Sequence, residues 1–519
     1  MNKILVLDTT LRDGAQGEGV IFSLEDKIKV IRALDDLGVD YIEAGNPASN
    51  PKDAQLFKYA KSGLALKNST LVAFGSTCRV NSSALNDEGL SALVESGCGV
   101  ASIFGKSSRY HVERVLMCTP EENLRIISES IAFLVSRGIR VFFDAEHFFD
   151  GWLYDADYAV ATLIAARDAG AESLVLCDTN GGALISTISA GVSAAIQKTG
   201  AHIGIHCHDD AGLAIAASMA AVEAGANFIQ GTINGYGERC GNANLCTLIP
   251  NIAFKLKRQC LDPEKIRLLT PTARLISDIA NLSMNERAPY VGRSAFSHKG
   301  GMHVDGMLKN ASTYEHIDPE AVGNRRRYLV SEMAGRTALM TRLSTIAPDL
   351  EKNSPDTIRI IDMLKELERE GYSFEGADGS LKLRVLGALG KRRVFFQVRD
   401  FHVISRLPDD NINAQAYVKV LVNDQVEITA DEGDGPVNAI DLALRKALSR
   451  FYPTLASMRL KDFKVRVVSG IGTASKVRVH IESTNGKNVW ATVGVSNNII
   501  EASLIALTDS IEYMLSESL

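Results

Sequence analysis

The first half of the chain alternates short apolar runs with longer segments of helical periodicity. Strands that alternate with helices in this way are typical of βαβ units, so the pattern predicts a parallel sheet. Eight such units in about 250 residues match the size of a (β/α)8 TIM barrel, an α/β fold. The expected strands are residues 4–8, 41–45, 71–75, 100–104, 140–146, 173–177, 202–208 and 227–232.

Polar residues at the ends of the intervening segments support the helical interpretation. Ser23 and Asp26 have the spacing of a capping box, and Gly38 closes the helix that they begin. Thr119 and Glu122 have the same spacing before a second apolar-periodic segment, where Glu122 is expected to complete the capping box. We therefore expect helices between the strands.

Two changes of pattern divide the chain into three expected domains. Residues 1–265 form the barrel, and residues 266–388 are mostly helical linker subdomains that include a Gly/His-rich loop at 297–306. Residues 389–519 change to alternating strands with helices near 436–451 and 499–516, which predicts a separate α+β domain.

Composition narrows the classes of protein to consider. The 519 residues are 46% hydrophobic with a net charge of −6, and the basic clusters are short, which argues against nucleic-acid binding. The chain has no apolar stretch of membrane-spanning length and enters a strand-like run without a signal-peptide pattern, so we expect a cytoplasmic protein. Eight cysteines without a C-x-x-C pair are expected to be reduced.

The reactive residues follow the expected strands, where TIM barrels hold their active sites. His206 and His208 are two positions apart on a strand, so both side chains point the same way while Cys207 points away. With Asp13 and the amide of Asn242 from neighbouring strand ends, they offer a mixed N/O set for Mg²⁺, Mn²⁺ or Zn²⁺. The alternative is a pair of hydrogen-bonded core histidines.

Two further charged residues have a structural and a catalytic interpretation. Arg12 either forms an ion pair with Asp13 or stabilises a substrate oxygen that becomes negative. Glu146 is either a solvated carboxylate at a strand end or a general base. No G-x-S-x-G, P-loop or defensible Cys/His pair occurs, so covalent nucleophilic catalysis has no support.

Four blocks carry a family resemblance: DTTLRDGAQ (8–16), CDTNGG (177–182), HCHDD (206–210) and NGYGERCGNAN (234–244). In this order they resemble the isopropylmalate, homocitrate and citramalate synthase family, and the resemblance covers essentially the whole chain. It implies condensation of acetyl-CoA with a 2-oxo acid, followed by cleavage of the thioester to release CoA. A divalent metal ion is the implied cofactor, and acetyl-CoA is the co-substrate.

The same resemblance implies roles for individual residues. The metal ligands would be Asp13, His206, His208 and Asn242, and the catalytic residues would be Arg12, Glu146, His303 and Tyr314. Glu146 would deprotonate acetyl-CoA, while His303 would assist from the Gly/His-rich loop together with Tyr314. Contacts to substrate are expected from Gln16, Glu43, Asn46 and Thr179, with Thr179 binding the carboxylate of the 2-oxo acid.

Several segments, including DAEHFFDGW (144–152), resemble the pyruvate-using branch of the family, whose product is citramalate, a step in isoleucine biosynthesis. One position departs from that branch: Asn46 stands before Pro47, where an aromatic residue is usual. The choice of 2-oxo acid therefore stays open, with the isopropylmalate and homocitrate reactions as alternatives.

The domain from residue 389 resembles the regulatory domain of the family, which dimerises and binds an amino-acid end product. This implies a homodimer and feedback inhibition by isoleucine. Two other classes remain in view. One is a metal-dependent acyl-CoA lyase or carboxyl-transferring relative on the same barrel, and the other is a non-catalytic amino-acid sensor that retains the fold.

Overall fold

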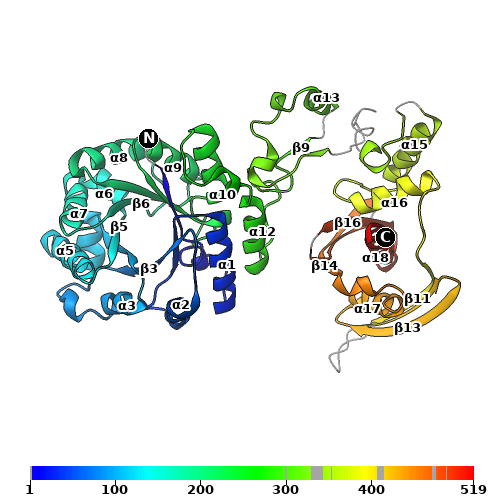
Figure 1. The fold of residues 1–519 in the computed structure, drawn as a ribbon, viewed down its shortest axis with the longest axis horizontal. Coiled ribbons are helices and arrows are strands. Elements are labelled where there is room, and N and C mark those ends of the chain that lie inside the picture. Colours follow the sequence, from blue (N-terminus) through cyan, green and yellow to red (C-terminus); the bar gives the residue numbers. More distant parts are fainter. Residues whose placement is uncertain are drawn as a thin grey trace. The chain divides into compact units, whose positions relative to one another are not determined.

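The computed structural model describes residues 3–298, 301–328, 343–351, 354–405, 414–469, 475–486 and 488–518. The chain divides into two compact units, each described by itself below (Figure 1). Unit 1 comprises residues 1–296 and 315–326, and unit 2 comprises residues 297–314 and 327–519. The predicted three-part division at residues 265 and 388 stays a prediction.

Unit 1 contains a closed barrel of eight parallel strands, in which β1 pairs with both β2 and β8. This confirms the predicted fold and all eight predicted strands, with ends that differ by at most one residue in most cases. The strands are β1 Leu5–Asp8, β2 Tyr41–Gly45, β3 Thr70–Ser76, β4 Val100–Lys106, β5 Arg140–Glu146, β6 Ser173–Asp178, β7 His202–Cys207 and β8 Phe228–Gly231.

Helices surround the barrel and bury their apolar faces against it, forming one continuous apolar core. The α-helices are α1 Leu24–Leu37, α2 Pro51–Gly63, α3 Glu88–Ser96, α4 Arg109–His111, α5 Pro120–Ser136, α6 Phe148–Tyr154, α7 Ala156–Asp168, α8 Ile185–Thr199, α9 Ala214–Glu223, α10 Leu245–Pro250, α11 Pro263–Ile266 and α12 Leu269–Ile279. Short 3-10 turns are η1 Gly14–Gln16, η2 Ala84–Asn86, η4 Ile233–Gly235 and η7 Pro319–Val322, and π-helical turns are η3 Val112–Leu116 and η5 Asn251–Lys255.

The predicted helix caps are confirmed in one case and corrected in part in the other. Ser23 and Asp26 form a complete capping box at the start of α1, and Gly38 ends that helix with a φ of 84°. At α5 the side chain of Thr119 accepts the backbone N–H of Glu122. The Glu122 carboxylate, however, accepts the N–H of Asn81 at 2.8 Å, because a neighbouring loop supplies a competing donor. The second half of the predicted box is therefore wrong.

Unit 2 contains two three-stranded antiparallel sheets with helices packed on them. Strands β11 Gln397–Ser405, β12 Ala414–Val422 and β13 Gln425–Gly433 form one sheet, which α17 Pro436–Leu448 covers. Strands β14 Arg459–Ser469, β15 Lys476–Thr484 and β16 Val489–Ser496 form the other, which α18 Ile499–Ser518 covers. The predicted α+β domain is confirmed.

The rest of unit 2 consists of short elements. They are β9 Ser297–His298, α13 Gly301–Lys309, η6 Ala311–Thr313, β10 Arg327–Tyr328, α15 Pro355–Arg369, α16 Asp378–Ala388 and η8 Pro453–Ser457. All eight cysteines of the chain are free, as predicted.

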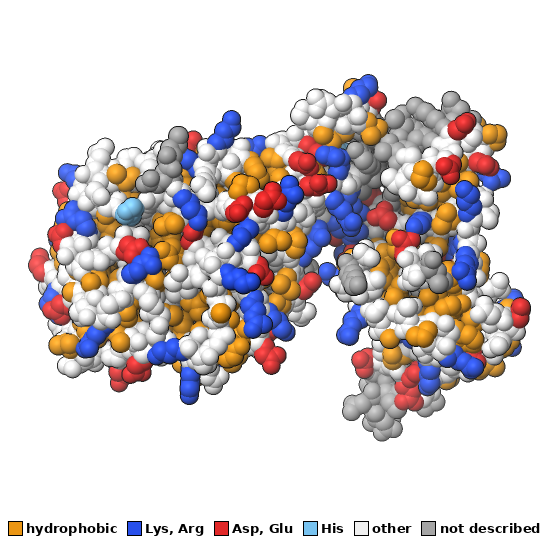
Figure 2. All heavy atoms as spheres, viewed as in Figure 1, with side chains coloured by type: hydrophobic (Ala, Val, Ile, Leu, Met, Phe, Trp, Pro, Cys, Tyr) orange, Lys and Arg blue, Asp and Glu red, His pale blue; other side chains and the backbone are white. Residues whose placement is uncertain are grey.

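Charged side chains of both signs are interspersed over the surface in the view of Figure 2. Within the described ranges, no helix combines the length and the apolar character needed to cross a bilayer.

Candidate active site

The inside of the barrel is layered, with apolar side chains below polar ones. Residues i and i+2 of a strand point to the same side, so each strand contributes to successive layers. A lower layer contains Tyr41, Val100, Phe142 and Phe228, and the residues two positions later are Glu43, Ser102, Asp144 and Gln230. The polar layer therefore rests on apolar packing, toward the carboxyl ends of the strands.

His206 and His208 extend this polar layer at the end of β7. They are 6% and 8% exposed, and the ring of His206 is directed toward Asp13. Cys207 is fully buried in the core between strands and helices, where its thiol hydrogen-bonds with Ser218 of α9. The predicted opposite directions of the histidines and the cysteine are thus confirmed.

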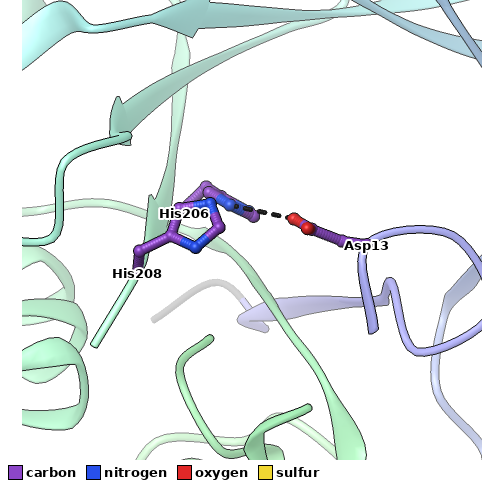
Figure 3. Close-up of side chains that lie close together, drawn as sticks. All are labelled: Asp13, His206 and His208. Carbon is purple, nitrogen blue, oxygen red and sulfur yellow. Dashed lines mark ion pairs between the residues drawn. The ribbon is translucent and has the colours of Figure 1, made fainter. Parts of the chain in front are cut away.

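Asp13 reaches the two histidines from the turn that follows β1 (Figure 3). One possible ligand atom from each of Asp13, His206 and His208 lies within 4.8 Å of the others. Oδ2 of Asp13 and Nε2 of His206 are 3.3 Å apart. The structure therefore brings together three of the four residues predicted as metal ligands in one buried cluster.

Hydrogen bonding shows that Oδ2 of Asp13 and Nε2 of His206, which face each other, are both acceptors. Nδ1 of His206 lies 3.0 Å from Oε1 of Gln230, and the Gln230 amide nitrogen donates to Oδ1 of Asp144 at 2.8 Å. These bonds fix the amide orientation, so Nδ1 of His206 carries the hydrogen. Burial lowers the pKa of His206 to about 4, which leaves Nε2 with a lone pair at neutral pH.

This donor set fits a divalent cation. A carboxylate oxygen and an imidazole lone pair that face each other at 3.3 Å repel unless a cation lies between them. Among the described residues, the buried atoms Nδ1 of His208 and Oδ1 of Asn242 have no hydrogen-bond partner. Two imidazoles, a carboxylate and an amide oxygen suit Mg²⁺, Mn²⁺ or Zn²⁺.

Gln230 and Asp144 were not predicted as site residues. Asp144 also accepts a hydrogen bond from Ser102 at 2.7 Å, and burial raises its pKa to about 6. Hydrogen bonds that run from Ser102 through Asp144 and Gln230 orient the imidazole of His206, a predicted metal ligand, from behind. The available sequence signal is a single polar residue, such as Ser102 or Gln230, within an otherwise apolar run.

Arg12 lies between carboxylates and an aromatic ring. Its Nε donates to Oε2 of Glu43 at 2.5 Å, Nη1 lies 3.6 Å from Oδ2 of Asp13, and its guanidinium lies 3.7 Å from the centre of the Phe74 ring. Burial disfavours the charge on Arg12, but Glu43 and Asp13 outweigh this effect and raise its pKa. The ring of Phe104 stacks on Phe74, which gives the site an apolar wall.

Glu43, predicted to contact substrate, is fully buried and contacts Arg12. Burial raises the pKa of Glu43 to about 7, although the nearby Arg12 opposes that effect. The structure thus indicates that Glu43 orients Arg12.

Glu146 and Thr179 lie at neighbouring strand ends. The Glu146 carboxylate pairs with Nζ of Lys106 from the end of β4 at 2.6 Å. Oγ1 of Thr179 accepts the backbone N–H of His147 at 2.8 Å, and the Thr179 carbonyl accepts a hydrogen bond from Arg239. Lys106 and Arg239 were missed, because a lysine or arginine beside a strand end also suits a solvated surface.

Gln16 and Asn46 were predicted to contact substrate. Gln16 is exposed in the turn η1. The Asn46 side-chain oxygen accepts the N–H groups of Ala48 and Ser49 at 3.0 and 3.2 Å, so it closes its own turn. The backbone N–H of Asn46 donates to the buried carboxylate of Asp53. These contacts stabilise the loop after β2.

His303 and Tyr314 belong to unit 2, whose placement relative to the barrel is not determined. Their rings lie 4.4 Å apart between centroids, and both side chains are exposed. The structure therefore supports their pairing with each other, and their participation in catalysis stays a prediction.

Three families match successive parts of the chain. Residues 3–272 match the HMGL-like family, residues 290–371 match the homocitrate synthase post-HMGL domain-like family, and residues 375–515 match the LeuA allosteric (dimerisation) domain.

Relatives match over nearly the full length. The (R)-citramalate synthase of Synechocystis sp. is 50% identical, over 98% of this chain and 95% of its own. The (R)-citramalate synthases of Aquifex aeolicus and Geobacter sulfurreducens are 47% and 46% identical, over 99% and 100% of this chain and 98% of their own. This chain belongs to the (R)-citramalate synthase family.

Proposed function

We propose that this chain condenses acetyl-CoA with pyruvate and hydrolyses the resulting thioester, giving (R)-citramalate and CoA. The observation that carries the proposal is the buried set of Asp13, His206 and His208 beside Arg12, in a chain that is 42–50% identical to five (R)-citramalate synthases. A cation site next to a buried guanidinium suits a reaction in which a carbonyl oxygen becomes negative.

We assign a divalent ion to Asp13, His206 and His208, with Oδ1 of Asn242 as a further ligand. When bound, Mg²⁺, Mn²⁺ or Zn²⁺ acts as a Lewis acid that polarises the carbonyl of the 2-oxo acid. Gln230 holds the imidazole of His206 in the tautomer that this role requires. The oxygen and imidazole ligands suit all three of these ions.

Arg12 and Thr179 bind the 2-oxo acid in this scheme. The guanidinium of Arg12 is held in place by Glu43 and Phe74, so it is preorganised to stabilise charge that develops on the carbonyl oxygen. The Thr179 hydroxyl already accepts a hydrogen bond from His147, which leaves its own hydrogen to donate to the substrate carboxylate.

Glu146 is the proposed base that removes a proton from the methyl group of acetyl-CoA. Nζ of Lys106 lies 2.6 Å from its carboxylate and holds it at the end of β5. Once Glu146 has taken the proton, the methyl carbon attacks the carbonyl carbon of pyruvate to form the new carbon–carbon bond. His303 and Tyr314 are proposed to assist this reaction on the basis of the family resemblance.

The C-terminal domain is proposed to dimerise and to bind isoleucine as a feedback inhibitor. The match of residues 375–515 to the LeuA allosteric (dimerisation) domain supports this proposal. We also propose a cytoplasmic location, as expected for an enzyme that uses acetyl-CoA. Calorimetry with isoleucine and sedimentation of the purified chain test the first two points.

Thiol release from acetyl-CoA tests the proposed reaction directly. The metal-supplemented protein is given pyruvate, 2-oxobutanoate, 2-oxoisovalerate or 2-oxoglutarate, with a chelator-treated sample as control. We expect a clear preference for pyruvate and loss of activity with the chelator. Preference for a larger acid would replace the substrate and keep the reaction class, whereas cleavage of an acyl-CoA without condensation would favour a lyase.

A further inference from the structure

The first residue after β5 is held in an unusual conformation. His147 follows Glu146 directly and has a φ of 57°, in the left-handed region that few residues other than glycine adopt. Its side chain is only 12% exposed although it lies at the mouth of the barrel. Residues held in such conformations cluster at functional sites, so the contacts of the His147 ring are a guide to its role.

Three separate contacts fix the position of His147. Its backbone N–H donates to Thr179 at 2.8 Å, and its ring atom Nδ1 lies 2.9 Å from Oδ2 of Asp150. Its ring stacks on the ring of His111, with 3.8 Å between centroids and 14° between planes. Asp150 is in turn held by the side-chain amide of Asn180, which donates to the same oxygen at 2.8 Å.

Close packing of two loops makes this stack possible. A side chain at Gly151 would place its first carbon 2.4 Å from the backbone oxygen of Ser107, so only glycine lets α6 approach the loop after β4 so closely. That approach brings His111 of α4 onto His147. Residues from the ends of β4, β5 and β6 therefore cooperate to position a single imidazole.

The hydrogen bond to Asp150 determines what this imidazole can do. An ionised carboxylate only accepts, so Nδ1 of His147 carries a hydrogen and Nε2 of the neutral ring has a lone pair. The same arrangement of carboxylate and imidazole provides the general base of many hydrolases.

We propose that His147, positioned by Asp150, is the general base for the thioester hydrolysis that completes the reaction. This inference rests on the proposed function. Nε2 of His147 takes a proton from water as the water oxygen bonds to the thioester carbonyl carbon. The carbon–sulfur bond then breaks, and the imidazolium returns that proton to the CoA sulfur. The products are a carboxylic acid, which ionises in solvent, and the CoA thiol.

The two adjacent residues Glu146 and His147 have different roles in this assignment. Glu146 holds the methyl proton when the carbon–carbon bond has formed, so it is not in the basic form that water activation needs. His147 is the next residue in the chain and lies beside Thr179, which is proposed to bind the other substrate. Condensation thereby uses Glu146 as its base, and hydrolysis of the thioester uses His147.

The two half-reactions are measured separately in the full-length, metal-supplemented enzyme. Exchange of the acetyl-CoA methyl hydrogens with deuterated water, in the presence of oxamate, reports the first base. Thiol release from synthetic citramalyl-CoA reports the second. We expect His147→Asn to lower hydrolysis by about 10²-fold or more and to leave exchange unchanged, since general bases contribute typically this much. Glu146→Gln should show the reverse pattern.

Two further variants keep the test decisive if His147→Asn folds poorly. Asp150→Asn retains the imidazole and should lower hydrolysis selectively but less, while Leu153→Ala, on the exposed side of the same helix α6, should leave both reactions intact. Equal losses of exchange and hydrolysis in His147→Asn and Asp150→Asn would overturn the assignment, because a merely structural role predicts that result, and so would unchanged hydrolysis. A wild-type enzyme that releases no thiol from either substrate set would overturn the proposed function itself.

Discussion

Oε1 of Gln230 lies 3.0 Å from Nδ1 of His206, and this one contact decides which nitrogen of the imidazole faces Asp13. The strand β8 therefore orients a predicted metal ligand of β7 through a side chain that is outside the predicted ligand set. Such supporting hydrogen bonds commonly set metal affinity.

Replacing Gln230 with leucine should weaken metal binding by about 10–100-fold. The variant leaves Nδ1 of His206 without its acceptor, so the tautomer with a lone pair at Nε2 is no longer favoured. Titration calorimetry with Mn²⁺ or Zn²⁺ measures the change, and Ser102→Ala, two contacts further away, should have a smaller effect. Equal affinity of wild type and Gln230→Leu would mean that Gln230 does not set the tautomer.

Removing the metal should lower thermal stability. A cation that binds only the folded state at a hundred times its Kd stabilises by about 2.7 kcal/mol. We expect the melting temperature to fall on dialysis against a chelator and to recover on addition of Mn²⁺, Mg²⁺ or Zn²⁺. Asp13→Asn supplies the control, since its melting temperature should not respond to the chelator. An unchanged melting temperature of the wild-type protein on treatment with the chelator would exclude a tightly bound cation.

Asn46 should act on the loop after β2 and not on substrate choice. Asn46→Asp retains an oxygen that accepts the N–H groups of Ala48 and Ser49, so we expect the same preference among 2-oxo acids as in the wild type. Asn46→Ala loses both bonds and should cost about 1 kcal/mol of stability. Competition assays with pyruvate and 2-oxobutanoate provide the measurement. A changed preference among 2-oxo acids in Asn46→Asp would instead support the predicted contact between Asn46 and the substrate.

A buried charge in unit 2 should make stability depend on pH. Asp509 is 3% exposed and lies 3.2 Å from Arg384; burial raises its pKa, although Arg384 and Ser380 oppose the effect. Because its pKa is higher in the folded than in the unfolded state, the folded state binds the proton more tightly and gains relative stability as the pH falls.

Arg384→Met removes one opposing charge and should therefore destabilise the protein more at pH 8 than at pH 5, by about 3 kcal/mol at the higher pH. Urea unfolding followed by tryptophan fluorescence in a Trp152→Phe background, where the signal comes from Trp490 of strand β16, measures both conditions. Arg369→Met on the exposed end of α15 is the matched control and should show no such pH dependence. If Arg384→Met lowers the free energy of unfolding by the same amount at pH 5 and pH 8, Arg384 does not stabilise the ionised form of Asp509.

The sequence predicted the barrel because its strands and helices have different periods, and the period does not depend on distant contacts. His206 and His208 were identified for the same reason, since their spacing and the end of an apolar run determine where both side chains point. Their relation to Asp13 followed from the rule that parallel strands end at one face.

Other features depend on contacts that a linear pattern does not contain. Asp144 and Gln230 meet across the barrel only when it closes, and the direction of the Asn46 side chain depends on the local turn. The stack of His111 on His147, which are 36 residues apart in the chain, requires their two loops to approach at Gly151. The predicted roles of His303 and Tyr314 rest on the family resemblance and not on a local pattern.

The apolar layer of Tyr41, Val100, Phe142 and Phe228 has a kinetic consequence. It fills the barrel beneath the polar residues, so both substrates arrive and both products depart through the same opening. With the smaller 2-oxo acid in its proposed position beside Arg12 and Asp13, a CoA ester bound first would obstruct its arrival. Steady-state kinetics should accordingly show an ordered sequence in which the 2-oxo acid binds first and CoA competes with acetyl-CoA.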